Sequence, residues 1–436
     1  MSDELKPTSG PRLDSRIPGF YRLNRSQRAD ALHARFGLSK AEVSALVTGD
    51  GLDFDRADKM VENCIGVFGL PIGLGLNFRI NGQDYAIPMV VEEPSVVAAV
   101  SHMAKVVRPY GGFEADADPG IMIAQVQVTG IVDFEVATQK LMAAEAQLLA
   151  LANSKNPNMV ARGGGAKRIE IRTFDAPHPM LVVHLLVDCV DAMGANAVNT
   201  MAEAIAPEVE ACTGGRVYLR ILSNLADQRC ARARCAVPFE GLEGKGFSGE
   251  SVAEGIVHAY RFAAVDPYRA ATHNKGVMNG IDAVAIATGN DWRGIEAGAH
   301  AFAARNGHYT SLTTWRISDG QLHGEIELPM AVGTVGGSTE VHPTIKVLRG
   351  ILGVESAREL AMVMAAVGLA QNMGALKALA TEGIQRGHMS LHARQAALAA
   401  GASSHQVDAV AEKLIESGNI KQAAALRIIA ELNGET

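Results

Sequence analysis

The sequence predicts an α+β protein, in which a large mixed helix/strand domain carries an inserted ferredoxin-like domain and ends in a helical segment. Three observations support this class. Apolar residues recur at helical spacing in some stretches and alternate as in strands in others. Residues 120–223 have the order β-α-β-β-α-β, which is the split βαβ arrangement. No G-x-G-x-x-G sequence follows an expected strand, which argues against a Rossmann domain.

Length and composition limit the protein class. A chain of 436 residues exceeds one ordinary core and predicts two or three domains. Its 48% hydrophobic and 20% charged residues are typical of a globular protein. A net charge of −7 with no basic block predicts binding neither to nucleic acid nor to a membrane surface. An anionic ligand would therefore need a local basic pocket.

Cysteine usage and hydropathy indicate a cytoplasmic location. The five cysteines have no metal-binding or redox spacing, so we expect reduced thiols rather than a disulfide framework. The N-terminus lacks the apolar region of a signal peptide, and no run of about 18 apolar residues predicts a transmembrane helix.

The first elements follow from local patterns. Residues 1–12 contain two prolines and a glycine and are predicted to be a loose tail. Ser39 and Glu42 have the spacing of a capping box, and Asp53 to Val67 carries apolar residues at helical intervals. Alternating residues on both sides of Asn81-Gly82 predict a β-hairpin with a type I′ turn.

The remaining patterns divide the chain into three domains. Within the inserted unit we expect, in order, a strand, a helix, two strands, a helix and a strand: Ile121–Val132, Phe134–Asn153, Lys167–Phe174, Met180–Cys189, Ala195–Cys212 and Arg216–Leu222. The predicted boundaries are 1–119 with 224–381 for the large domain, 120–223 for the small domain and 382–436 for the C-terminal segment. That last segment is rich in alanine with few bulky anchors, so it could dock loosely and move as a lid does.

Two glycine-containing segments of the small domain are candidates for binding a nucleotide. Asp191-Ala-Met-Gly-Ala-Asn196 joins a predicted strand to a predicted helix, where backbone N–H groups and a small residue suit a pyrophosphate. A plain turn has the same spacing. Gly163-Gly-Gly165 is either a flexible element that admits a cofactor or an ordinary loop.

Three polar clusters fall in the large domain. Glu92-Glu-Pro-Ser95 opens an apolar helix, so its acids either complement the helix dipole or belong to a site. The segment Asp266–Gly280 is dense in hydrogen-bonding groups, which indicates either a site or an internal network. Gly289-Asn-Asp-Trp292 follows an apolar run, Ala283–Thr288, that predicts a strand, and a carboxylate at such a terminus often points into a cleft.

A histidine pair lies in the C-terminal segment. His388 and His392 are four residues apart on one predicted helical face. No third ligand is apparent and the zincin sequence is absent, so we predict no metal site. The sequence also lacks a nucleophile elbow.

Taken together, these segments resemble the HMG-CoA reductase family, and in particular its class II bacterial type. The resemblance runs from about Asp14 to the C-terminus. Six segments occur in the family's order: Glu62-Asn-Cys-Ile-Gly66, Pro88–Ser95, Asp191–Asn196, Asp266–Gly280, Gly289–Trp292 and Gly383-Ile-Gln-Arg-Gly-His388.

The resemblance implies how the domains are used. The large domain would bind the acyl-CoA, the small domain a dinucleotide without a Rossmann fold, and the C-terminal segment would be a mobile flap. The segment at Glu62-Asn63 resembles the family's dimerisation element, which implies a homodimer, or a higher oligomer of dimers, with the active site at the interface. The implied ligands are HMG-CoA, mevalonate and CoA, with neither nucleic acid nor membrane as a partner.

The family's reaction implies a role for four residues. A thioester is reduced to an alcohol by two hydride transfers through a hemithioacetal and an aldehyde, and each transfer builds negative charge on an oxygen. Lys275 would stabilise that charge, and Asp291 would keep the lysine protonated and aimed. Glu93 would act as an acid, with a pKa raised by burial and by Asp291. His388 would protonate the departing CoA thiolate. A structural ion-pair network in an inactive relative is the alternative.

The resemblance also implies binding residues. Those expected at the substrate are Ser95, Arg269, Asn279 and, more weakly, Asn224; those expected at the coenzyme are Asn156, Asp191, Met193, Gly194 and Asn196. His273 and His392 are read as structural. Asn156 stands where NAD-preferring relatives can have a carboxylate, and an amide does not repel a 2′-phosphate, so NADP (NADPH) is possible. Overall similarity favours NAD (NADH).

Two rival functions stay open at this point. One is a non-catalytic acyl-CoA or nucleotide-binding relative, and the other is a CoA-ester hydrolase. The same residues serve mevalonate synthesis and mevalonate degradation, so the sequence does not fix the direction.

Overall fold

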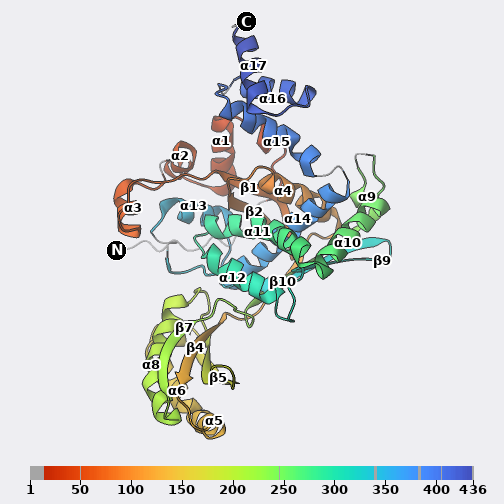
Figure 1. Cartoon of the computed structure of the whole chain (residues 1–436). Coiled ribbons are helices and arrows are strands. Elements are labelled where there is room, and N and C mark those ends of the chain that lie inside the picture. The colour runs from red at the N-terminus through yellow and green to blue at the C-terminus, as the bar shows by residue number, and fades with distance from the viewer. Residues whose placement is uncertain are drawn as a thin grey trace.

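A computed structural model describes residues 14–49, 51–244, 246–337, 341–381, 384–403 and 405–434 of the chain, with residues 384–391 described only as backbone. The predicted loose tail lies outside these residues. Figure 1 shows a central body, a separate lobe below it that holds the sheet of β4 to β7, and the C-terminal helices above it.

The central body contains a hairpin and a four-stranded antiparallel sheet. The hairpin pairs β1 (Ile72–Ile80) with β2 (Gln83–Val90). Its turn residues Asn81 and Gly82 have φ values of 50° and 78°, as a type I′ turn requires, so this prediction is confirmed. The sheet has the strand order β3-β8-β10-β9 and is built from β3 (Glu114–Ala117), β8 (Cys230–Pro238), β9 (Thr313–Ser318) and β10 (Gln321–Pro329).

Helices pack around these strands. They are η1 (Phe20–Arg22), α1 (Arg25–Phe36), α2 (Lys40–Thr48), α3 (Phe54–Met60), α4 (Val96–Val107), η2 (Arg108–Tyr110), α9 (Phe239–Leu242), α10 (Gly249–Val265), α11 (Pro267–Ala287), α12 (Trp292–Ala303), α13 (Pro343–Leu352) and α14 (Ala357–Ala380). Ser39 and Glu42 form the predicted capping box of α2. One core cluster joins the hairpin, the sheet and the long helices, with Phe78, Phe113 and Trp315 fully buried in it.

Helix α14 is long and apolar enough to cross a membrane, which no run in the sequence analysis indicated. Within the protein, however, 78% of its most apolar window is buried. Its residues pack against α11, α10 and α4, so it is the central helix of the core.

Two predicted elements of the large domain are wrong. In the apolar run Ala283–Thr288, residues Ala283–Ala287 are the last of α11 and Thr288 is its C-cap, so the run is no strand. A short buried apolar run has no distinguishing periodicity, and its alanines favour a helix. The helix expected over Asp53–Val67 ends at Met60, and Val61 already has extended backbone angles. The apolar side chains beyond it, Ile65 among them, are exposed and have no core to pack against.

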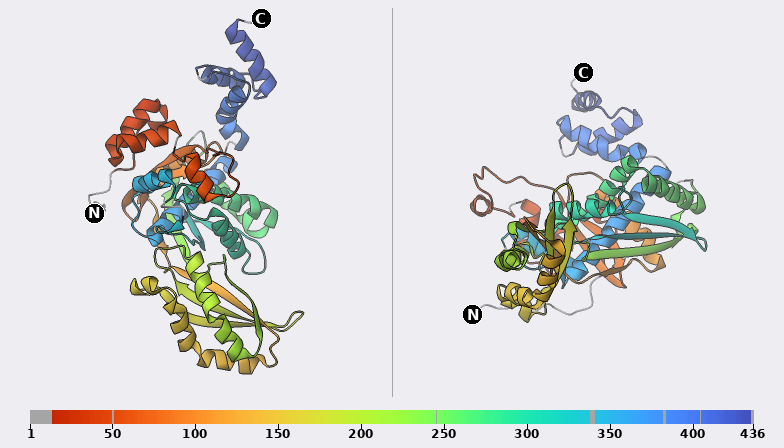
Figure 2. Two further views of the ribbon diagram at one scale, coloured as in Figure 1. Left: turned by 90° about the vertical axis from the view of Figure 1, so that its left-hand side faces the viewer. Right: turned by 60° about the horizontal axis from the view of Figure 1, so that its bottom comes forward.

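The lobe has its own sheet and core. Its strands β4 (Ile121–Thr129), β5 (Gly165–Phe174), β6 (Met180–Asp188) and β7 (Arg216–Leu222) have the order β5-β6-β4-β7, and all neighbours are antiparallel. Helices α5 (Phe134–Ala143), α6 (Glu145–Ser154), α7 (Pro157–Ala161) and α8 (Ala195–Thr213) pack with them, and α5, α6 and α8 lie together on one side of the sheet (Figure 2). The single helix predicted over Phe134–Asn153 is interrupted at Ala144.

The C-terminal helices α15 (Ile384–Ala399), α16 (Val407–Glu416) and α17 (Gln422–Asn433) form a small bundle. Alanines and a few larger residues, such as Val410, Leu414 and Ile428, make a core separate from that of the central body. Figure 2 shows this bundle projecting from the central body, at a distance from the lobe.

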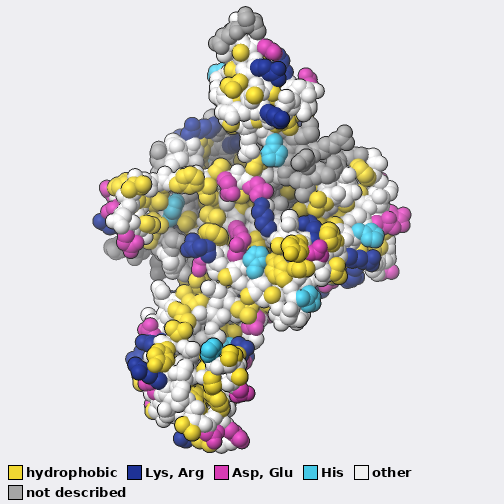
Figure 3. Space-filling view, viewed as in Figure 1, with side chains coloured by type: hydrophobic (Ala, Val, Ile, Leu, Met, Phe, Trp, Pro, Cys, Tyr) yellow, Lys and Arg dark blue, Asp and Glu magenta, His cyan; other side chains and the backbone are white. Residues whose placement is uncertain are grey.

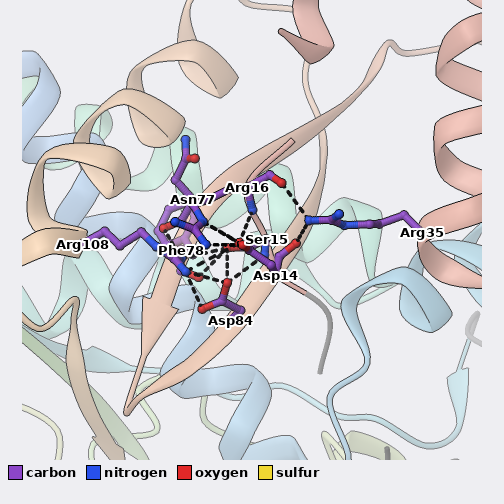
Figure 4. Close-up of polar contacts among 8 residues, drawn as sticks. All are labelled: Asp14, Ser15, Arg16, Arg35, Asn77, Phe78, Asp84 and Arg108. Carbon is purple, nitrogen blue, oxygen red and sulfur yellow. Dashed lines mark hydrogen bonds and ion pairs between the residues drawn. The ribbon is translucent and has the colours of Figure 1, made fainter. Parts of the chain in front are cut away.

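The start of the described chain is fastened to the hairpin by a polar network (Figure 4). Ser15, which is 2% exposed, donates from Oγ to the Phe78 carbonyl at 2.9 Å, and its N–H donates to Asp84 at 2.7 Å. Arg108 binds both oxygens of Asp84, at 3.0 and 2.8 Å. This bidentate ion pair orients Asp84, which with the Phe78 carbonyl holds Ser15 against β1 and β2.

Candidate active site

Helix α11 brings two predicted site residues to a third. Lys275 and Asn279, four residues apart, lie on one face of α11. Glu93 follows strand β2 and reaches that face. Lys275 Nζ lies 2.7 Å from Glu93 Oε2, and Asn279 Nδ2 lies 3.4 Å from the same oxygen. The structure therefore joins a cation, a carboxylate and an amide at one place.

This cluster is open to solvent in the single chain. The Lys275 and Glu93 side chains are 59% and 39% exposed. The predicted burial of Glu93 is thus not observed, because no element of the described chain covers this face of α11. Figure 3 shows acidic and basic side chains mixed at the middle of this side of the molecule, below the C-terminal bundle.

Asp291 does not make the predicted contact. It caps the N-terminus of α12, where it accepts a hydrogen bond from the Gly294 N–H at 3.2 Å, and Arg293 lies 3.9 Å away. Within the described chain, Lys275 has its ion pair with Glu93 and none with Asp291. Asp291 follows a helix rather than a strand, so the geometry that would aim it at a cleft beyond a sheet does not apply.

Asn224 lies beside Asp291. A Cβ added to Gly294 would be 2.9 Å from Asp291 Oδ2 and 3.1 Å from Asn224 Oδ1. The glycine thus leaves room for both side chains. Asn224, the more weakly expected substrate-binding residue, therefore lies next to Asp291, an expected catalytic residue, although the two are distant in the chain.

Ser95 and Glu93 line a large groove. Ser95 has a left-handed φ of 75° and precedes α4. The groove has a volume of about 1540 Å³ and runs between the segment at residues 16–28, the hairpin and α4. Its basic lining residues, which sequence reasoning missed, are Arg16, Arg25, Arg28, Lys105 and Arg108. They are scattered singly along the sequence and form no detectable motif.

Arg269 is half-buried in the first turns of α11. It has no hydrogen bond or ion pair with any described residue, and burial lowers the pKa of its guanidinium. A half-buried cation without a carboxylate partner suits an anionic ligand. It lies four residues before His273, which puts it on the His273 side of α11, and its charge acts on that histidine.

The other face of α11 carries a buried polar network. His273, which is 2% exposed, has Nε2 at 2.7 Å from Thr313 Oγ1 and 3.0 Å from Asn372 Nδ2. Burial, together with the charge of Arg269, lowers the pKa of His273 to about 3. His273 is therefore a neutral structural residue, as predicted, and the segment Asp266–Gly280 contributes both to a site and to an internal network.

The five coenzyme candidates gather at the N-terminus of α8. Gly194, the N-cap residue, has φ 98°, and no capping side chain accepts a hydrogen bond from the first N–H groups of the helix. Asn156 Nδ2 approaches the Ala197 carbonyl at 3.5 Å, and Asn196 is exposed. Asp191 Oδ1 accepts from the Ala357 N–H, the first of α14, at 2.9 Å.

A cavity of about 320 Å³ adjoins this helix start. Asp191 and Ala192 line it together with Met159 and Arg162. Arg162 was missed in the sequence, although it directly precedes the glycine run. Gly163 and Gly165 both have positive φ values, and a Cβ on Gly165 would lie 2.3 Å from Asn153 Oδ1. The run therefore forms a tight turn at the rim of the cavity.

The remaining predictions concern cysteines and histidines. All five cysteines are free thiols, as expected. His388 is on α15, but its side chain lies outside the described residues, and so does Gly383. His392 is exposed. In the part of the chain that the structure describes, no group of three or more His, Cys, Asp or Glu residues could hold a metal ion.

Comparison with known proteins identifies the family. The family model described as hydroxymethylglutaryl-coenzyme A reductase matches residues 24–393. A 3-hydroxy-3-methylglutaryl-coenzyme A reductase of Archaeoglobus fulgidus is 51% identical over 422 residues, which cover 96% of this chain and 95% of the relative. A probable reductase of the same name from Borreliella burgdorferi is 35% identical, covering 76% of each chain.

Solved structures agree. A 3-hydroxy-3-methylglutaryl-coenzyme A reductase from Streptococcus pneumoniae superposes with a TM-score of 0.82 at 42% identity, covering 95% of this chain and 99% of the other. A class II reductase structure from the same organism, bound to NADPH in open conformations, has a TM-score of 0.81 at 43% identity and covers 84% of this chain and 99% of the other. The mixed α+β fold with several antiparallel sheets and the Lys275–Glu93 site thus occur in a chain that belongs to the hydroxymethylglutaryl-coenzyme A reductase family.

Proposed function

We propose that the protein interconverts HMG-CoA with mevalonate and free CoA. In the reductive direction two reduced nicotinamide coenzymes each deliver one hydride. The first converts the thioester to the hemithioacetal mevaldyl-CoA, which releases CoA to leave mevaldehyde, and the second converts the aldehyde to the alcohol. The observation that carries this proposal is the ion pair of Lys275 with Glu93, a residue that lines the groove, in a chain of this family.

Lys275 is the proposed electrophile. Its ammonium is exposed beside Glu93, where a carbonyl oxygen that gains charge during hydride addition could meet it. A preorganised donor at such an oxygen typically contributes about 3–4 kcal/mol to lowering the barrier. Glu93 Oε2 lies 2.7 Å from Lys275 Nζ, so Glu93 can donate a proton to the same oxygen as the aldehyde is reduced.

Asp291 and His388 complete the proposed catalytic set. Asp291 would hold Lys275 charged, which requires its turn to meet Lys275 in the assembled, substrate-bound enzyme. His388 would protonate the CoA thiolate from α15. Because Glu93 is partly exposed, an element that closes over it would exclude water from the site. Residues 382–436 are proposed as this flap, because their helices have a separate core and could move as a unit.

The remaining assignments divide the ligands between domains. Residues 1–119 and 224–381 would bind the acyl-CoA, with Arg269 and Ser95 at the acyl group and Asn224 beside Asp291. Residues 120–223 would form a ferredoxin-like dinucleotide-binding domain. Its strand order β5-β6-β4-β7 supports the topology, and the uncapped start of α8 suits a pyrophosphate.

The coenzyme is a nicotinamide dinucleotide. The preference for NAD inferred from overall similarity is a prediction without support from the comparisons, since one solved relative is bound to NADPH. Asn156, next to the start of α8, places no negative charge against a 2′-phosphate.

A soluble, cytoplasmic homodimer is the proposed assembly. Beyond α3 the chain exposes several large apolar side chains, among them Ile65 at 100% and Phe68 at 88%. Such a protruding apolar segment marks an interaction surface, and it contains the element that resembles the family's dimer contact. In Figure 1 this part of the chain extends from the central body beside α3.

The test is an assay of the purified protein with HMG-CoA and either NADH or NADPH. We expect oxidation of two coenzymes for each CoA released, and the reverse reaction from mevalonate, CoA and oxidised coenzyme. Release of CoA without coenzyme oxidation would assign a hydrolase instead. Ligand binding with no turnover in either direction would assign a non-catalytic relative.

A further inference from the structure

Arg229 is a buried arginine that the proposed chemistry does not use. It precedes β8 and is 4% exposed. Its backbone is fixed on both sides, since its N–H donates to the Ala226 carbonyl at 3.0 Å and its carbonyl accepts from the Met330 N–H at 2.9 Å. Among the described residues its guanidinium forms no ion pair and is bound by backbone carbonyls alone.

Those carbonyls belong to two segments. Nη1 donates to the carbonyls of Ala192 and Met193, at 3.2 and 3.3 Å, and Nη2 donates to the carbonyl of Val332. Ala192 and Met193 are in the segment that opens α8, whereas Val332 follows strand β10 of the central body. One planar group therefore joins the coenzyme loop to the large domain.

These bonds determine the direction of the loop's N–H groups. In a trans peptide the C=O and N–H point in opposite directions. With the carbonyls of Ala192 and Met193 turned to Arg229, the N–H groups of Met193 and Gly194 point away from it. The first N–H of the uncapped helix α8 follows directly. The guanidinium also adds a buried positive charge behind this end of the helix, where an anion is favoured.

The same segment continues to the turn of Asp291. Gly333 N–H, directly after Val332, donates to Asn290 Oδ1 at 2.7 Å. Thr334 N–H donates to the Asp191 carbonyl at 2.8 Å. A Cβ on Gly333 would lie 2.5 Å from Met193 N, so the two backbones are in direct contact. The contacts therefore run from the loop through residues 332–334 to the residue before Asp291.

We propose that Arg229 is a positioning residue for the coenzyme: it sets the Asp191–Asn196 loop and fixes it to the segment that supports the Asp291 turn. This inference rests on the proposed function, because it assigns the loop to the dinucleotide. Burying a charge without a carboxylate partner raises the free energy of the folded state. The hydrogen bonds to the three carbonyls offset this increase only if the loop keeps this conformation.

Arg229→Lys is the first test. Lysine keeps the charge, but a single nitrogen replaces the planar fork and cannot reach both segments in the same way. We expect the KM for the reduced coenzyme, and its Kd measured without HMG-CoA, to rise at least tenfold, while the KM for HMG-CoA stays within twofold. Arg232→Lys is the matched control, since Arg232 lies three residues further along and binds Asp118 and Glu327 instead.

A second variant leaves Arg229 in place. Gly333→Ala puts a methyl group against Met193 N, so the loop must shift, and we expect the same rise in coenzyme KM and Kd. Gly350→Ala, on helix α13 with nothing within 4 Å of the added Cβ, is its control. Circular dichroism and thermal unfolding would check the fold of each variant.

The outcomes separate this inference from the proposed function. If the wild-type protein fails to oxidise NADH or NADPH with HMG-CoA, the proposed function is wrong. If the wild type is active and folded Arg229→Lys or Gly333→Ala has coenzyme constants within twofold of it, the role of Arg229 is wrong. An equal rise in the KM for HMG-CoA would also overturn it, because a general loss of structure predicts that result. Should Arg229→Lys not fold, the Gly333→Ala result decides.

Discussion

Lys275 and Glu93 are 182 residues apart in the sequence, yet Nζ and Oε2 are separated by 2.7 Å. The pair joins α11 to the segment after β2. Its partial exposure makes it a weak source of stability, because solvent screens the attraction. Because Glu93 lines the groove, the pair is placed for chemistry rather than for stability.

Replacing the lysine tests that use. We expect Lys275→Met to lower kcat by about 10²–10³, as loss of an oxyanion donor does. The midpoint of thermal unfolding should change little, since the pair is exposed. Lys40→Met, at an exposed position of α2, is the control and should retain full activity. A folded Lys275→Met protein with wild-type kcat would refute the assignment.

Asp291 can be tested without disturbing its cap. Asparagine caps a helix about as well as aspartate, so Asp291→Asn should leave the unfolding midpoint nearly unchanged. Activity should fall at least tenfold, because the neutral amide does not hold an ammonium charged. Asp133→Asn changes the cap of α5 in the same way and should be fully active. Equal activities for the two variants would leave Asp291 only its capping role.

The exposed segment after α3 predicts dimerisation. A charge at Ile65, as in Ile65→Asp, should convert a dimer to a monomer in sedimentation experiments and abolish activity, since an apolar interface does not accommodate an unpaired carboxylate. Val132→Asp introduces the same group at another fully exposed position, in the lobe, and should remain dimeric and active. A dimeric, active Ile65→Asp protein would place the interface elsewhere.

Asn156 predicts coenzyme choice. Asn156→Asp should raise the NADH over NADPH ratio of kcat/KM about tenfold, because a carboxylate repels a 2′-phosphate. Ser154→Asp, with the same charge at an exposed position two residues earlier, controls for long-range effects. An unchanged ratio in Asn156→Asp would show that this side chain does not face the ribose.

Asp282 predicts how stability depends on pH. Burial, and the adjoining Glu296 carboxyl, raise the pKa of Asp282 to about 8. Between about pH 4 and pH 8 the folded protein therefore holds a proton that the unfolded chain has lost, so the free energy of unfolding falls as pH rises through this range. Asp282→Asn should flatten that decline in urea unfolding, whereas Asp30→Asn, at an exposed site, should not. An equal decline in both variants would contradict the prediction.

The sequence predicted well those features that depend on neighbouring residues. The hairpin at Asn81-Gly82, the capping box at Ser39 and the strand Arg216–Leu222 each follow from local turn or periodic patterns. The candidate site residues came mainly from the family resemblance. Of these, the structure places Glu93, Lys275 and Asn279 together, whereas Asp291 contacts Gly294 and Arg293 and forms no ion pair with Lys275.

Features that depend on long-range packing were missed or wrong. Ala283–Thr288 was predicted as a strand because a buried apolar run has the same composition in either state, and only its position in α11 decides. The basic lining of the groove and the role of Arg229 left no local signal.

The sequence by itself determined the chemical groups of this protein, because residue types and turn preferences act within a few residues. The tertiary structure alone decided which groups meet. Lys275 reaches Glu93, and Arg229 reaches two segments more than 35 residues away, one on each side of it. Such contacts arise when the hairpin, α11 and the two sheets pack around their shared cores, and no local pattern encodes them.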